Sequence, residues 1–176
     1  MTKRQEFRVI QSYSDFEVRE YLPCVIAEVR VSANFSESSS SAFSMLFNYI
    51  SKGNKSSEKI AMTAPVITAQ IEDVSDSAEW HVSFVMPSDS TFDQMPQPNN
   101  SQVRLRELDT ERCVAKSFRG RATDGLSRKI AQELRASAAK ANISLTSETR
   151  ICRFDPPFKP GILHYNEIVI PIYQGE

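Results

Sequence analysis

Residues 59–66 read Lys-Ile-Ala-Met-Thr-Ala-Pro-Val. Proline fixes its own φ at about −65° and keeps the preceding residue out of the helical region, so Ala64 and Pro65 must be extended. The run therefore predicts a corner that leads into a strand over Val66–Ile71. A stiff corner beside a loop can form the rim of a ligand site. The alternative is that the aliphatic and thioether side chains of the run pack in the core, because methionine commonly fills gaps there.

Similar stretches recur in the two halves of the chain. We interpret them as an internal duplication, with pseudo-repeats over about 7–87 and 103–173, each in the order strand, strand, helix, strand, strand. A unit of this size does not bury its apolar face alone. We therefore expect the two halves to share one core in a single domain, residues 1–176. The matched stretches are Val18-Arg19-Glu20-Tyr21 with Leu105-Arg106-Glu107-Leu108, and Phe84-Val85-Met86-Pro87 with Ile168-Val169-Ile170-Pro171.

Alternating apolar residues and β-branched side chains predict further strands. Pro23 and the stretch Asp109-Thr110-Glu111 indicate hairpin turns, and Pro87–Gln102 has the composition of an exposed connector. The predicted strands are Phe16–Glu20, Val25–Val31, His81–Met86, Val103–Leu108 and Glu167–Ile172.

Two helices are predicted from their capping residues and from their periodic apolar faces. Asn34 or Ser36 can cap a first helix that runs to about residue 52, where Gly53 is the expected stop. Thr123 can cap a second helix that runs to about residue 140, with Asn142 as a left-handed terminator.

Composition sets broad limits on function. The chain has 176 residues, 24% of them charged and 40% apolar, which is typical of a globular domain. A formal net charge of −1 argues against a sequence-independent nucleic-acid binder, and no apolar run reaches the about 20 residues of a membrane span. Cys24, Cys113 and Cys152 form no CxxC pair, so we expect reduced, buried thiols. A cytoplasmic protein that is monomeric or weakly oligomeric is the resulting expectation.

Few residues are candidates for chemistry. The common nucleotide-binding, zinc-protease and serine-hydrolase motifs are absent from the sequence. The two histidines, His81 and His164, are weak candidates for metal ligands, since a histidine in a strand is usually a surface or core residue. The three lysines of the loop after the first helix, Lys52, Lys55 and Lys59, could meet an anionic ligand or could simply be solvated.

The chain resembles the SOUL haem-binding protein family over nearly its whole length. The likeness rests on Phe16 to Tyr21, Phe43 to Ile50, the 59–66 run, Asp155-Pro156-Pro157 and Asn166-Glu167-Ile168. The resemblance implies an α+β fold in which duplicated ββαββ halves form a distorted eight-stranded antiparallel barrel flanked by two helices. The same fold resembles the effector-binding domains of gyrase-inhibitor-like proteins, so the fold alone does not identify the ligand.

The resemblance implies a non-enzymatic carrier or buffer that binds haem, or another tetrapyrrole, reversibly. A hydrophobic cleft would use Phe43, Phe47, Ile50 and Met62 as its apolar wall, and lysines at 52, 55 and 59 would meet the propionates. Met62 is expected to pack against the porphyrin face rather than to bind the iron.

Two other functions stay open. A gyrase-inhibitor-like small-molecule hydrolase would need inward-facing carboxylates or tyrosines, such as Glu28 or Tyr165. A protein-interaction module would use the groove or the proline-rich loop Asp155–Gly161, which displays Phe158 and which we match in the duplication to the segment Met62–Pro65.

Overall fold

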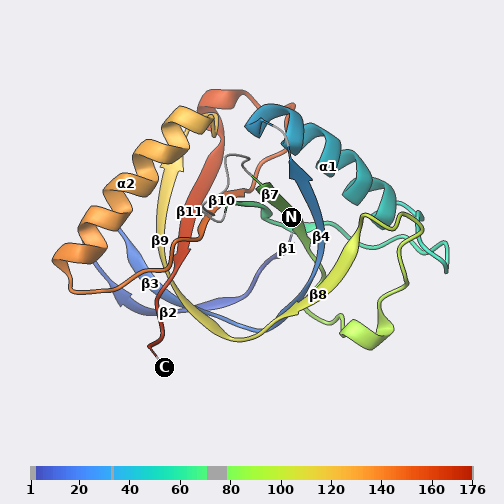
Figure 1. Ribbon diagram of the computed structural model, residues 1–176, viewed down its shortest axis with the longest axis horizontal. Coiled ribbons are helices and arrows are strands. Elements are labelled where there is room, and N and C mark those ends of the chain that lie inside the picture. Colours follow the sequence, from blue (N-terminus) through green and yellow to red (C-terminus); the bar gives the residue numbers. More distant parts are fainter. Residues whose placement is uncertain (1–2, 33, 71–78, 176) are drawn as a thin grey trace.

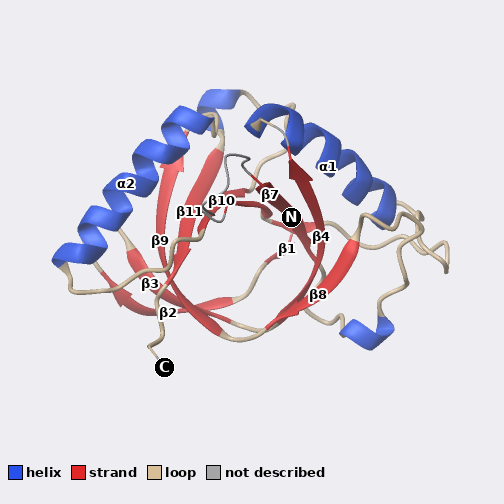
Figure 2. Ribbon diagram, viewed as in Figure 1, coloured by secondary structure: helices blue, strands red, loops and turns tan. Residues whose placement is uncertain are grey.

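The computed structural model describes residues 3–32, 34–70 and 79–175 of the chain. It has an α+β fold, in which one curled antiparallel sheet carries helices α1 (Phe35–Ile50) and α2 (Asp124–Lys140) on its convex side (Figures 1 and 2). Each helix begins with the predicted kind of cap: Asn34 accepts a hydrogen bond from the Glu37 amide, and Thr123 accepts one from the Leu126 amide.

The sheet has nine strands, which confirms the predicted fold class and adds one strand to the predicted eight. The sheet is a curled half-barrel, with β2 and β8 at the two ends of the strand order. The order is β2 (Phe7–Ser12), β3 (Glu17–Tyr21), β9 (Glu111–Arg119), β11 (Tyr165–Pro171), β10 (Thr149–Arg153), β6 (Val66–Gln70), β7 (Glu79–Val85), β4 (Cys24–Ser32) and β8 (Arg104–Leu108). A separate short pair joins β1 (Lys3–Arg4) to β5 (Thr63–Ala64) in parallel. Ile71, the last residue of the predicted strand at β6, lies outside the described residues.

The two predicted hairpins are wrong. Strand β3 pairs with β9 rather than with β4, and β8 pairs with β4 rather than with β9. The turns at Pro23 and at Asp109-Thr110 therefore carry the chain from one half of the sheet to the other. The first half contributes β2 and β3 beside β9 of the second half, and the second half contributes β8 beside β4 of the first. The two halves therefore form one continuous sheet around the central β10 and β6 pair.

Three apolar clusters hold the sheet and helices together. One lies between α2 and the sheet and includes Leu134, and a second lies between α1 and the sheet and includes Leu46. The third contains no helix residue and lies on the concave side, where Cys113 and Cys152 are buried and form no disulfide. Burial raises the pKa of the Cys113 thiol to about 12, so the expectation of a buried thiol holds there. Cys24 is only half-buried.

The end of α1 differs from its prediction. Lys52, with φ of 89°, adopts the left-handed conformation that we expected of Gly53. Glycine is required at position 53 for another reason, because a Cβ atom there would lie 2.6 Å from the backbone oxygen of Asn48. At the end of α2 the prediction is confirmed, since Asn142 has φ of 57°.

The segment that follows β7 is not a fully exposed connector. It contains a 3-10 turn over Phe92–Gln94, and Met95 packs into the cluster under α1. The Tyr49 hydroxyl donates a 2.8 Å hydrogen bond to the Pro96 carbonyl, which fixes this segment beside the end of the helix. No helix among the described residues is long and apolar enough to cross a membrane.

Candidate functional site

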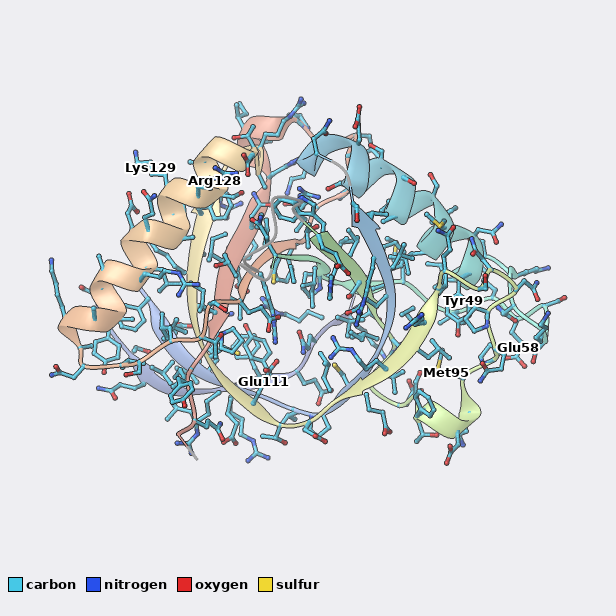
Figure 3. All side chains as sticks on the ribbon, in the orientation of Figure 1. Tyr49, Glu58, Met95, Glu111, Arg128 and Lys129 are labelled. Atoms are coloured by element: carbon cyan, nitrogen blue, oxygen red, sulfur yellow. The ribbon has the colours of Figure 1, made fainter. Side chains whose placement is uncertain are left out.

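The loop after α1 folds back against the end of the helix. Asn54 is buried, and its side chain donates hydrogen bonds to the carbonyls of Tyr49 (3.0 Å) and Glu58 (2.8 Å) and accepts one from the Glu58 amide (3.1 Å). The Ile60 amide then donates to the Ile50 carbonyl at 2.8 Å. Figure 3 shows Tyr49, Glu58 and Met95 on this side of the molecule. Asn54 therefore sets the course of the chain from the helix into the 59–66 run.

Apolar side chains remain exposed on α1 and in the 59–66 run. Phe47 is 49% exposed and stacks on Phe43, with ring centroids 6.0 Å apart, while Met62 is 43% exposed. Phe43 is half-buried and meets the ring of Phe84 edge-on, so it anchors the stack to the sheet. Ile50 requires a correction, because it is only 4% exposed and belongs to the core under α1. It supports the helix and offers no surface to a ligand.

The three predicted lysines all lie in the folded-back loop and are exposed. The backbone of Lys59 forms an antiparallel bridge with Ser51, and the Lys55 amide donates to the Gln97 carbonyl at 2.8 Å. Within the described residues none of these lysines forms a salt bridge with a carboxylate of the chain. We call Phe43, Phe47, Met62, Lys52, Lys55 and Lys59 the helix-end surface.

Neither histidine lies on the helix-end surface. His81 is in β7, with its ring nitrogens 3.7 Å from a carboxylate oxygen of Glu28 and 3.3 Å from one of Glu79. His164 lies just before β11, where its Nε2 is 2.8 Å from the Lys159 carbonyl oxygen. The described residues hold no group of three or more His, Cys, Asp or Glu side chains that could bind a metal ion.

A second group of polar residues lies on the concave side of the sheet and centres on Glu167 of β11. Glu167 is 1% exposed and accepts hydrogen bonds from Arg19 Nη1 at 2.8 Å and from the Tyr165 hydroxyl at 2.6 Å. Arg4 of β1 completes the set with contacts of 3.3 and 3.4 Å to the two carboxylate oxygens. We call these four residues the concave cluster.

The concave cluster keeps its carboxylate ionised. Burial on its own would raise the pKa of Glu167, but the hydrogen bonds from Arg19 and Tyr165 outweigh it and hold the pKa below its usual value of 4.5. Burial, together with the hydrogen bond to Glu167, raises the pKa of Tyr165. Tyr165, a candidate of the hydrolase hypothesis, does contact a carboxylate here, but that carboxylate is Glu167 rather than the predicted Glu28, and it is already occupied by two arginines.

Glu28, the other inward-facing carboxylate that we predicted, is buried in the opposite half of the sheet. It accepts a 2.9 Å hydrogen bond from Arg106 and lies 3.5 Å from the Ser83 hydroxyl. Arg19 and Arg106, which lie in the two matched stretches, therefore each bind a buried glutamate. Both arginines lie in the matched stretches that we used only to detect the duplication, and the glutamates that follow them there, Glu20 and Glu107, are not the ones they bind.

The proline-rich loop does not correspond to the segment before β6. Residues 155–160 connect β10 to β11. In the strand order β10 and β6 occupy equivalent places in the two halves, so the equivalent connection in the first half is the one from β6 to β7. The loop and the 59–66 run nevertheless lie at the same end of the sheet, because Arg153 pairs with Val66. Phe158 is 88% exposed, as the sequence predicted for a displayed side chain.

A groove of about 410 Å³ lies between α2 and the sheet, with Trp80 and Ile151 on its sheet side. Arg128 and Arg135 come from the helix side. Arg135 is bound to the backbone of the segment before β10, with a 2.8 Å hydrogen bond to the Thr146 carbonyl. No pattern in the sequence indicated this groove.

The fold is shared with several solved structures. The C-terminal domain of EcmrR is 14% identical to the chain with a TM-score of 0.71, and the match covers 91% of this chain and 98% of that domain. In a complex of EcmrR with DNA the match covers 57% of the EcmrR chain. A hydrolase from Listeria innocua is 10% identical with a TM-score of 0.61, covering 92% of this chain and 94% of the other. SAV2435 bound to tetraphenylphosphonium is 9% identical with a TM-score of 0.57, covering 90% and 94%. At these identities the likeness establishes the fold alone.

Sequence comparison identifies the family. A search of curated protein sequences finds no significant match. The sequence pattern described as "SOUL heme-binding protein", however, matches residues 2–171, which confirms the resemblance carried by the 59–66 run. The chain belongs to the SOUL haem-binding protein family.

Proposed function

We propose that the protein is a non-enzymatic carrier or buffer that binds haem, or another tetrapyrrole, reversibly at the helix-end surface. Family membership supports the class of ligand. The observation that carries the proposed location is the combination of exposed Phe47 and Met62 with three lysines that have no carboxylate partner among the described residues. A porphyrin is a flat apolar ring that carries two propionate carboxylates. Exposed apolar side chains would contact its ring, and unpaired lysines would contact its carboxylates.

Contacts with the porphyrin ring would supply most of the affinity. Phe47 and Met62 are each about half exposed, so covering them would contribute about 1 kcal/mol apiece. Phe43 holds Phe47 in place by stacking, which reduces the entropy that binding would cost. Two ion pairs between lysines and propionates at an exposed surface add only about 0.5 kcal/mol each.

The residues present fit the porphyrin and its propionates better than they fit the iron. Both histidines have partners elsewhere, His81 beside Glu28 and His164 beside the Lys159 carbonyl. Met62 offers a thioether, which is a weak ligand when it acts alone. We therefore expect haemin and iron-free protoporphyrin to bind with similar affinity.

An absorbance titration of the protein with haemin and with protoporphyrin tests the proposed ligand. Saturable binding of both compounds with similar affinity is the expected result. The absence of saturable binding for either compound would end the proposal. A much tighter association of haemin would show that an iron ligand, rather than ring contact, dominates.

Three charge variants test the proposed location. Replacing the three lysines together (Lys52→Gln, Lys55→Gln and Lys59→Gln) should weaken haemin binding about fivefold and reduce its salt dependence. Lys129→Gln is the matched control, because Lys129 is an exposed lysine on α2, far from Glu58 in Figure 3. If Arg128→Gln weakened binding and the triple variant did not, the ligand would belong to the groove beside α2 instead.

A further inference from the structure

The guanidinium group of Arg4 is contacted on three sides by other side chains. Its guanidinium carbon is 4.8 Å from the ring centroid of Phe7 and 4.7 Å from that of Phe154. One guanidinium nitrogen lies 3.3 and 3.4 Å from the two carboxylate oxygens of Glu167. Two aromatic rings and a buried carboxylate are the groups that bind guanidinium and amidinium ions most favourably.

The walls of this site do not depend on Arg4. Glu167 is held by Arg19 and by the hydroxyl of Tyr165. Tyr165 also meets the ring of Phe154 edge-on, with centroids 5.3 Å apart. Phe7 packs against Tyr21 at 5.4 Å and lies under the guanidinium of Arg19. Each wall would therefore keep its position if Arg4 were withdrawn.

The carboxylates around the site outnumber the arginines when Arg4 is left out of the count. Glu17 and Glu167 share the single guanidinium of Arg19, with contacts of 2.8 Å to each. Without Arg4, the group of Glu17, Glu167 and Arg19 carries a net charge of −1. A buried carboxylate favours a cation strongly, because the surroundings screen its charge poorly. An arginine in cis satisfies this requirement, and so would a small organic cation.

Arg4 reaches the site from a short, exposed strand. Its strand, β1, has only two residues, both exposed, and pairs with the equally short β5. The Arg4 side chain is itself 41% exposed. Beside it the cavity lined by Glu167, Phe154 and Tyr21 has a volume of about 10 Å³, which is room for roughly one water molecule. An external ligand can therefore enter only by displacing Arg4.

We propose that the concave cluster is a second binding site, selective for a small planar monocation of the guanidinium or amidinium class, and that Arg4 occupies this site from within the chain. The site selects the opposite charge to the helix-end surface. It does not depend on the tetrapyrrole proposal.

Calorimetric titration of the Arg4→Ala protein with benzamidinium chloride tests the proposal. Saturable binding is expected, at an affinity at least about tenfold above that of the unaltered protein, since a charge-assisted contact with Glu167 becomes available. Benzamide has the same shape without the charge and should bind about tenfold more weakly than benzamidinium to the variant. Equal affinity of the variant and the unaltered protein for benzamidinium, or equal affinity of the variant for the two compounds, would overturn the proposal.

Matched variants separate the site from general charge effects. Arg8→Ala removes an exposed arginine from the adjoining strand β2 and should bind benzamidinium no better than the unaltered protein. Adding Phe154→Leu to Arg4→Ala removes one aromatic wall and should weaken binding about fivefold. Arg4→Gln serves in place of Arg4→Ala if circular dichroism shows that the alanine variant is unfolded. Tighter binding by Arg8→Ala, or no effect of Phe154→Leu, would refute the assignment.

Discussion

Replacement of Asn54 by alanine should lower the stability of the protein more than any other change in the loop after α1. The buried side chain makes three hydrogen bonds, with donor to acceptor distances of 3.0, 2.8 and 3.1 Å, to the backbone of Tyr49 and Glu58. A typical hydrogen bond contributes about 1 kcal/mol net, so Asn54→Ala should lower the free energy of unfolding by about 3 kcal/mol.

Urea unfolding followed by circular dichroism measures this loss. In a chain of this size the loss corresponds to a fall in Tm of about 6 to 12 °C. Asn99→Ala is the control, because Asn99 is an exposed asparagine in the facing segment and should change stability by less than about 0.5 kcal/mol. A loss below about 1 kcal/mol for Asn54→Ala would refute the view that this side chain holds the loop against the helix.

The same variant tests the link between the loop and the ligand. Lys55 and Lys59 lie on the segment that Asn54 fixes, so loosening that segment should weaken haemin binding and reduce its dependence on salt. The measurement is the absorbance titration at low and at high salt. If the variant were destabilised as expected and still bound haemin with unchanged affinity, the lysines of the loop would not be the propionate contacts.

Three further changes have defined outcomes. Gly53→Ala should lower the free energy of unfolding by about 2 kcal/mol in urea, because the new Cβ would lie 2.0 Å from Oδ1 and 2.6 Å from the backbone oxygen of Asn48. Because the pKa of Glu167 is lowered in the folded protein, its ionised form stabilises the fold above about pH 4.5, and this contribution is lost as the pH falls through the folded pKa. The free energy of unfolding, measured between about pH 6 and 3, should therefore depend less on pH in Glu167→Gln than in the unaltered protein. Thr68→Val should raise the Tm slightly, because Oγ1 of Thr68 is buried without a hydrogen-bond partner among the described residues.

The secondary structure could largely be predicted because its signals are local. Alternation located β3, β4, β7, β8 and β11 to within about two residues, and the caps at Asn34 and Thr123 marked the starts of both helices. Strand pairing was predicted wrongly at both turns, since sequence neighbours usually pair and nothing local reports an exchange between the halves.

The candidate sites could be predicted only in part. The helix periodicity and the lysine-rich loop indicated the helix-end surface, but the burial of Ile50 depends on the loop that returns beside it. The concave cluster could not be predicted, because Arg4, Arg19 and Glu167 are far apart in the sequence and meet only when the sheet curls and brings β1, β3 and β11 to one concave face, with β9 between β3 and β11.

The sequence by itself determined the family, the α+β class, the two capped helices and the corner at residues 59–66. These depend on backbone restrictions and on patterns that extend over a few residues. Only the tertiary structure decided which strands pair, which apolar residues stay exposed and which charges meet in the interior. Those properties arise from contacts between residues that are separated in the sequence, such as the contact of Arg19 with Glu167, and a contact of this kind leaves no local pattern in the sequence.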